Sequence, residues 1–226
     1  SLIKCVEKHP EVISVNSKLL NFYDRKTIDG VGILINEVGQ ARSIGWQKKD
    51  QGQFKEEKYI FGATGGASLF KQKEFIKLGM FDADFFMYSE EVDFAFRAQF
   101  AGLRSIYCPQ AIVYHKHKAT AKKNLSKVEY WQFRNMTLTI IKDFPTPLLL
   151  KNWRWLKIIL VHLNTIFYQL KKGYWWSPFL ADLWILSHLP KLLLARRKIQ
   201  KNIKVNLDYI DEFLVEKKIS FWGLFR

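Results

Sequence analysis

Strand-like and helix-like segments alternate along the first two thirds of the chain, and this alternation constrains the fold more than any other feature. β-branched and aromatic runs predict a strand at 12–15, strand pairs within 30–46 and 58–72, and a strand over 104–117 that breaks at Pro109. Helical spacing predicts helices at 73–79, 90–102 and 127–144. Gly79 and Gly102 suit the ends of the first two, because glycine readily adopts the left-handed conformation found there.

The net charge of +15 on 226 residues implies an anionic partner. Nucleic acid, a nucleotide-sugar diphosphate and an anionic membrane face all stay open, because charge alone does not distinguish them. A hydrophobic content of 48% indicates a folded chain. Cys5 and Cys108 are far apart and lack metal-ligand spacing, which favours free thiols in a reducing compartment. The chain opens without an initiator methionine, so we expect a fragment whose N-terminal part is missing.

Scarce carboxylates gather in one of the most aromatic parts of this basic chain: Asp82, Asp84, Glu90, Glu91 and Asp93. Glu91 falls in the first turn of a predicted helix, where the helix macrodipole stabilises a carboxylate by up to about 1 kcal/mol. Such a group suits a general base or a ligand for a hydroxyl. The alternative is that it only stabilises the helix. Asp93 and Arg97 stand four residues apart, which predicts an ion pair within the helix.

The stretch "GGASLFKQKEFIKLGMFDADFFMYSEEVDFAFRAQFAGLRSIYCPQAIVYHKH" resembles the C-terminal half of the GT-A domain of family 2 glycosyltransferases, close to the bacterial rhamnosyltransferase-like group. "EYWQFRN" resembles the Tyr-x-x-x-Arg-Asn of the same group, and "IDGVG" and "DQGQF" also look like it. The pattern is specific in combination, and no single piece of it is. The matching positions in the long stretch are Gly66, Ala67, Gly79, Phe81, Asp82, Phe85, Phe86, Tyr88, Glu90, Asp93, Arg97, Gly102, Pro109, Ala111, Val113 and His115.

The resemblance implies an α/β fold, in which residues 1–145 form the C-terminal, acceptor-side half of a GT-A domain with a Rossmann-like mixed sheet. It implies an inverting, nucleotide-sugar-dependent glycosyltransferase of the hexosyl or rhamnosyl type, acting in bacterial cell-surface polysaccharide synthesis. The catalytic base would be Glu91, beside Glu90 and Asp93. Here the chain departs from the family, because Glu90-Glu91 stands where the family has Glu-Asp. The side chain of the base is therefore one methylene longer. A misplacement of an ångström can cost about a hundredfold in rate.

Further residues would contact substrates by the same resemblance, and each has a structural alternative. The donor and acceptor would meet Gly65, Gly66, Ala67, Tyr88, Arg97 and Arg134. The glycines can equally form a plain turn, and Arg134 with its neighbours on one helix can be structural.

A divalent metal, Mg²⁺ or Mn²⁺, is implied as cofactor. His115 would meet the metal or the diphosphate, with a surface histidine as the alternative. The family's Asp-x-Asp motif does not occur in a suitable place before residue 60, so we expect the main metal ligands in the missing N-terminal part and no activity from this fragment alone. The processive Gln/Arg-x-x-Arg-Trp signature is also missing, which favours one sugar added per encounter.

Residues 146–226 are rich in Trp, Leu, Lys and Arg and predict a helical, amphipathic tail. Charged residues and prolines interrupt each apolar run before about 20 residues, and Trp and Tyr beside Lys and Arg are typical of an interfacial helix. The tail would bind an anionic membrane surface, placing the protein in the cytoplasm at the inner face of the cell membrane. The alternatives are that the helices of the tail pack on the catalytic core or that they span the bilayer.

The acceptor would then be a lipid-linked glycan or an oligosaccharide, and the donor a nucleotide sugar. The alternative function is a non-catalytic basic module that binds an anionic membrane or nucleic acid. Nucleic acid is not expected as a partner, because binding it gives no reason for an acidic helix start beside Phe-Phe-x-Tyr.

Overall fold

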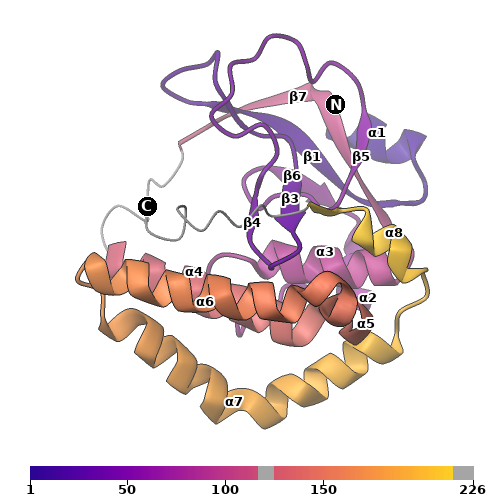
Figure 1. Cartoon of the computed structure of the whole chain (residues 1–226). Coiled ribbons are helices and arrows are strands. Elements are labelled where there is room, and N and C mark those ends of the chain that lie inside the picture. The colour runs from indigo at the N-terminus through magenta and orange to yellow at the C-terminus, as the bar shows by residue number, and fades with distance from the viewer. Residues whose placement is uncertain (117–124, 216–226) are drawn as a thin grey trace. The chain divides into compact units, whose positions relative to one another are not determined.

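The computed structural model describes residues 1–116 and 125–215. Contacts divide the chain into two compact units (Figure 1). The first comprises Ser1–Leu34, Ala41–Ala83 and Glu90–Thr120, and the second comprises Ile35–Gln40, Asp84–Ser89 and Ala121–Arg226. The fold is mixed α/β, as predicted at that level. The division predicted at residue 145 is one of function and stays a prediction.

A curled mixed sheet forms the core of the first unit, in the strand order β2-β1-β7-β5. Its strands are β1 (Val12–Asn21), β2 (Ile28–Gly30), β5 (Lys58–Ile60), β6 (Ser68–Phe70) and β7 (Arg104–His115). The central pair, β1 with β7, is parallel, and the other pairs are antiparallel. β1 is buried along almost its whole length, and its buried residues include the polar or charged Ser14, Asn16, Ser17 and Lys18.

The predicted break at Pro109 is wrong, because β7 continues through it. The register against β1 jumps instead: Ser17 pairs with Cys108, and the next residue, Lys18, pairs with Ile112. The extra residues form a bulge. Proline has no N–H to donate to the strand ladder, and a bulge accommodates it without ending the strand.

Three helices complete the first unit: α1 (Leu2–Lys8), α2 (Gln72–Lys77) and α3 (Glu90–Phe100). The predicted ends of α2 and α3 are confirmed, because the glycines that follow them, Gly79 and Gly102, have φ of +89° and +77°. α3 packs on β1 through a cluster that includes Ile13, Phe94 and Ala98. The strand pair predicted within 30–46 is also confirmed, since residues 37–40 join β3 (Ile33–Asn36) to its neighbour β4 (Ala41–Ser43).

The second unit is mainly helical. Its elements are α4 (Leu125–Asp143), α5 (Thr146–Leu150), the short 3₁₀ helix η2 (Lys151–Trp153), α6 (Arg154–Lys171), α7 (Trp176–Lys201), α8 (Leu207–Asp211) and β8 (Leu214–Val215). α4 packs along α7. The shared core consists of Phe85, Leu138, Ile185 and Leu192, so the short segment Asp84–Ser89 contributes a buried phenylalanine to this unit.

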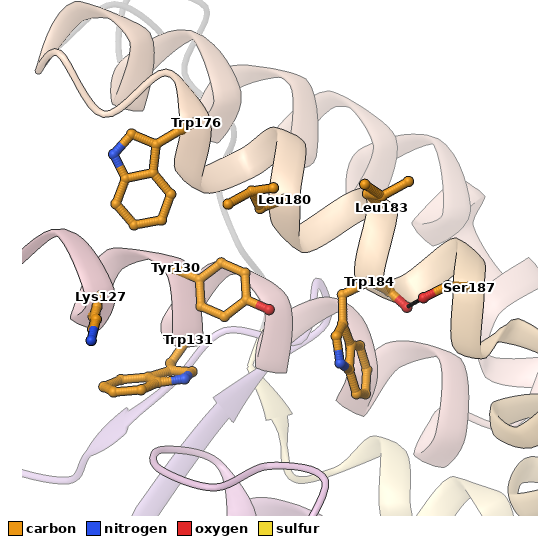
Figure 2. A pocket seen from close by; sticks show the side chains of 8 residues that line it. All are labelled: Lys127, Tyr130, Trp131, Trp176, Leu180, Leu183, Trp184 and Ser187. Atoms are coloured by element: carbon orange, nitrogen blue, oxygen red, sulfur yellow. Dashed lines mark hydrogen bonds between the residues drawn. The ribbon is translucent and has the colours of Figure 1, made fainter.

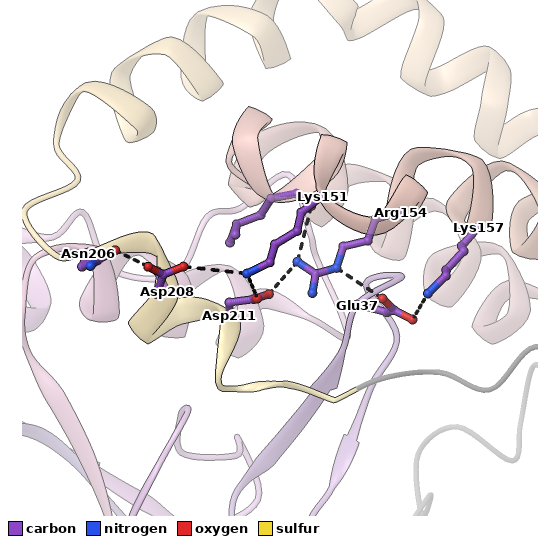
Figure 3. Close-up of polar contacts among 8 residues, drawn as sticks. Glu37, Lys151, Arg154, Lys157, Asn206, Asp208 and Asp211 are labelled. Carbon is purple, nitrogen blue, oxygen red and sulfur yellow. Dashed lines mark hydrogen bonds and ion pairs between the residues drawn. The ribbon is translucent and has the colours of Figure 1, made fainter.

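A network of ion pairs ties the start of α6 to the turn after β3 and to α8 (Figure 3). Glu37 is 2% exposed and pairs with Arg154 at 3.3 Å and with Lys157 at 2.8 Å. Asp211 pairs with Arg154 at 2.5 Å and with Lys151 at 2.7 Å. Because the guanidinium is buried, both of its carboxylate partners are needed to offset its desolvation.

α6 and α7 leave much apolar surface exposed. On α6 the exposed stripe follows helical spacing: Leu156, Leu160, Leu163, Phe167 and Leu170. In the described part of the chain, α7 is the helix long and apolar enough to cross a membrane, and 22% of its most apolar stretch is buried. Core helices of soluble proteins meet the same criterion, so length and composition alone do not place α7 in a bilayer.

Candidate functional site

Two adjacent carboxylates begin α3. Glu90 and Glu91 each have one carboxylate oxygen, Oε2, that is buried without a hydrogen-bond partner in the described chain. Burial first, and then the negative charge of Glu90, raises the pKa of Glu91 from 4.5 to about 7, although a backbone hydrogen bond acts to lower it. A carboxyl group with this pKa gains and loses its proton near neutral pH. It can therefore serve as a general base there.

The helix face that carries Glu91 lies along the chain segment that follows β5. One turn on, Ala95 packs so closely on Gly62 that a Cβ at residue 62 would lie 2.4 Å from the alanine methyl. A further turn on, the side-chain amide of Gln99 donates to the carbonyl of Phe61 at 2.8 Å. Glu91 lies one turn before Ala95 on this same face of the helix.

Asn16, fully buried on β1, organises that glycine-rich segment. Its side-chain oxygen accepts hydrogen bonds from the backbone N–H of Thr64 at 2.7 Å and from the hydroxyl of Ser68 at 3.2 Å. Next to it, the carbonyl of Ala67 accepts a hydrogen bond from the hydroxyl of Ser17 at 2.7 Å. The segment is thus fixed to the sheet at both ends.

The two predicted glycines between these anchors differ in their surroundings. A Cβ at Gly65 would meet nothing within 4 Å, so this residue borders open space. A Cβ at Gly66 would lie 2.8 Å from a methyl of Leu19 and 3.9 Å from the imidazole of His115. The structure therefore places Gly66 beside His115, and the roles of these residues in substrate binding stay predictions.

His115, at the end of β7, pairs through Nδ1 with the buried carboxylate of Asp29 on β2. An imidazole nitrogen and a carboxylate oxygen are donors that Mn²⁺ accepts, whereas Mg²⁺ prefers oxygen alone. Two donors make up only part of an octahedral shell. These two side chains already pair with each other, and the metal role of His115 stays a prediction.

Asp93 and Arg97 form the predicted ion pair within α3, with a distance of 2.9 Å from Arg97 Nε to Oδ2 of the fully buried Asp93. The same guanidinium donates to the carbonyls of Leu78 and Met80, and so holds the loop after α2. These contacts give both residues a structural role. Their proposed roles in catalysis and substrate binding stay predictions.

In the second unit, two neighbouring residues of α4 form hydrogen bonds with the segment Asp84–Ser89. Arg134 donates to the carbonyls of Asp84 and Phe85 at 2.7 and 2.9 Å. Asn135 donates to three carbonyls of the segment, including that of Tyr88 at 2.7 Å. Tyr88 and Arg134 therefore belong to one hydrogen-bonded arrangement. On the side of the segment, these contacts are made by backbone carbonyls.

The segment Asp84–Ser89 has a strained backbone. Phe86, Tyr88 and Ser89 have φ between +60° and +70°, a region that costs residues other than glycine about 1–3 kcal/mol each. Such strain clusters at functional sites, and this segment leads directly into Glu90. Ser89 directly precedes α3, and its φ of +66° differs from the extended geometry usual at an N-cap.

Sequence reasoning did not single out Asn16 and Asp29 as site residues. Asn16 is a polar residue within an otherwise strand-forming run, which is a usable signal for a buried polar contact. Asp29 lies within the family-like stretch "IDGVG", but its contact with His115 has no local signal, because the two residues are 86 positions apart.

A second cluster with metal-ligand chemistry lies near the start of the chain. Ligand atoms of Cys5, His9 and Glu57 are all within 4.8 Å of one another. Glu57 already accepts hydrogen bonds from Lys8 at 2.7 Å and from His9 at 3.0 Å. Burial raises the pKa of the Cys5 thiol to about 12, which opposes formation of the thiolate that a metal requires. We therefore interpret this cluster as an ion-pair network.

Comparison with protein-family models found no match, and comparison with curated proteins found none either.

Proposed function

We propose that the chain is the acceptor-side part of an inverting glycosyltransferase of family 2, with a GT-A fold of the rhamnosyltransferase-like kind. It would move a sugar from a nucleotide-sugar donor to a lipid-linked glycan during synthesis of bacterial surface polysaccharide. The observation that carries the proposal is the carboxyl of the partly buried Glu91, which has one buried oxygen without a hydrogen-bond partner among the described residues and a pKa raised to about 7. A buried acid of this kind is costly for stability, and such groups concentrate where chemistry needs them.

In the proposed reaction, Glu91 accepts the proton of the acceptor hydroxyl while that oxygen attacks the anomeric carbon of the donor. The bond to the nucleoside diphosphate breaks from the opposite face, which inverts the configuration. Proton transfer of this kind contributes about 10²–10⁴-fold to a rate. Glu90 contributes through its charge, because a neighbouring negative charge favours the protonated form of Glu91.

Gly65 and Gly66 would let the substrate approach the backbone, and His115 with Asp29 would face its diphosphate end. A divalent metal bound there would offset charge on the leaving diphosphate. The main metal ligands would lie outside this chain.

Peripheral attachment to the inner face of the cell membrane is part of the same proposal. The exposed apolar stripe of α6 supports it, as do exposed tryptophans beside lysines at its ends, such as Trp153 (68% exposed) and Trp175 (66% exposed). Trp beside Lys is typical of helices that lie in the interface of an anionic bilayer. A basic module that binds nucleic acid is the alternative. It explains neither the buried acid nor the exposed aliphatic stripe.

The test is sugar transfer by the protein that contains this chain, with membranes of its source as acceptor and a panel of nucleotide sugars as donors. Glu91→Gln is expected to lower release of nucleoside diphosphate about 10²–10⁴-fold with an unchanged circular dichroism spectrum. Glu56→Gln, which changes an exposed glutamate of the same unit, is the matched control. Full activity of Glu91→Gln would rule out the assigned base. Oligonucleotide binding with steep salt dependence and no transfer would favour the alternative.

A further inference from the structure

An aromatic groove lies within the second unit, between α4 and α7, with a volume of about 520 Å³ (Figure 2). Volumes of about 300–1,000 Å³ are usual for ligand pockets. Its lining residues are Lys127, Tyr130 and Trp131 from α4, and Trp176, Leu180, Leu183, Trp184 and Ser187 from α7. These positions recur at helical spacing, so one face of each helix forms one wall. In Figure 2, Trp176 and Leu180 lie across the groove from Tyr130.

Contacts behind the walls hold the aromatic rings in place. Trp184 lies between the guanidinium of Arg134, 4.5 Å from its ring, and the imidazole of His188, stacked at 4.1 Å. On the opposite wall, Trp131 packs against Phe86 at 4.9 Å. A groove whose walls are already ordered loses little side-chain entropy when a ligand binds.

The chemistry of the lining favours a hydrocarbon chain over a sugar ring. The hydroxyl of Ser187 is already hydrogen-bonded to the carbonyl of Trp184 and to His188. Most other lining atoms belong to indole rings and leucines, whereas a sugar would need several polar partners for its hydroxyls. An alkyl chain needs none and gains affinity from apolar burial alone.

The charge of the groove points to an anionic head on that chain. Lys127 is the sole formal charge among the described residues that line it, and it lies at one end. The groove also opens onto exposed apolar surface of α7, because Leu183 belongs both to its wall and to the stripe Phe179–Leu183–Leu186, which is 52–65% exposed. A chain held in the groove can therefore continue along an apolar surface.

We infer that the groove between α4 and α7 binds the hydrocarbon chain of a single lipid whose anionic phosphate lies beside Lys127. The binding follows from the groove itself. That this lipid is the carrier of the sugar acceptor rests on the proposed function. Arg134, which packs on Trp184 of the groove wall, also donates a hydrogen bond to the carbonyl of Asp84.

The experiment is calorimetric titration of the whole chain with alkyl phosphates of 8, 10 and 12 carbons, each below its micelle concentration. Affinity is expected to rise up to about fourfold per added methylene, because each buried methylene is worth about 0.8 kcal/mol. Lys127→Gln is expected to weaken the alkyl phosphate at least about threefold and to leave the matching alkanol unchanged.

Leu183→Asp should weaken dodecyl phosphate at least about tenfold, because it places a carboxylate in the wall beside the chain. Leu193→Asp is the matched control, since this leucine of α7 is 50% exposed and lies outside the lining. The inference is overturned if the chain shows no saturable binding, if both variants weaken it equally, or if maltose binds in preference. Lipid binding without any effect of Glu91→Gln on sugar transfer would instead overturn the proposed function alone.

Discussion

Replacing Glu91 by glutamine should change how the stability of the protein depends on pH. Burial and the charge of Glu90 raise the pKa of Glu91 from 4.5 to about 7 in the folded chain. Between these two pH values the folded state holds a proton that the unfolded state has released. Stability therefore falls as pH rises through this window, and the loss is complete above the folded pKa.

The size of the effect follows from the same two values. At about 1.4 kcal/mol per pH unit, a rise from 4.5 to about 7 corresponds to about 3 kcal/mol lost between acid and neutral pH. Glutamine stays neutral throughout, so the Glu91→Gln variant lacks this loss. Relative to wild type, it should gain about 3 kcal/mol in the free energy of unfolding between about pH 4.5 and pH 8.

Urea denaturation at several pH values between 4.5 and 8 measures the difference. Glu56→Gln removes an exposed carboxylate from the same unit and should follow wild type throughout. Glu90→Gln removes the repelling charge and should lower the pKa of Glu91, which shortens the window from its upper end. Carbon NMR of the Glu91 carboxyl in each protein reports that pKa directly.

A constant stability difference between Glu91→Gln and wild type across the whole range would refute the reasoning. It would mean that the carboxyl ionises in the folded chain as it does in the unfolded one. The physical basis for a general base at this position would then be lost.

Two further substitutions test the packing and the charge network. Gly62→Ala should destabilise the protein by about 1–3 kcal/mol in thermal unfolding, since its methyl would lie 2.4 Å from the Cβ of Ala95. At Gly65 an added Cβ would meet nothing within 4 Å, so the stability of Gly65→Ala should differ from that of wild type by no more than about 0.5 kcal/mol. Glu37→Gln should lower the free energy of unfolding, measured with urea, by about 3 kcal/mol, because it leaves two basic side chains of α6 without this buried partner. Glu212→Gln, which changes an exposed glutamate, is the control. An equal effect of the two substitutions would contradict the buried network.

Much of the secondary structure could be predicted because its signals are local. The ends of α2 and α3 follow from Gly79 and Gly102, and the pair Asp93–Arg97 follows from helical spacing. The bulge in β7 could not be predicted. Pro109 indicates that the hydrogen-bond ladder is interrupted, but only the pairing with β1 decides whether the strand ends there or continues with a shifted register.

In the candidate site, too, local features could be predicted from the sequence and long-range contacts could not. The sequence indicated carboxylates at a helix start, a glycine-rich segment and a histidine at a strand end. It could not indicate that Asn16 fastens the glycine-rich segment, or that Asp29 pairs with His115, because each contact joins residues far apart in the chain. The aromatic groove was also missed, since Trp131 and Trp184 are neither close in sequence nor part of one motif.

By itself, the sequence determined where α2 and α3 end and which residues carry charge, because these properties depend on neighbours within one or two turns of the chain. Tertiary structure decided the environment of each group. Glu91 is an ordinary glutamate in the sequence, and only burial beside Glu90 brings its pKa to about 7. Desolvation is a property of everything that surrounds a side chain, and most of those surroundings come from distant parts of the chain.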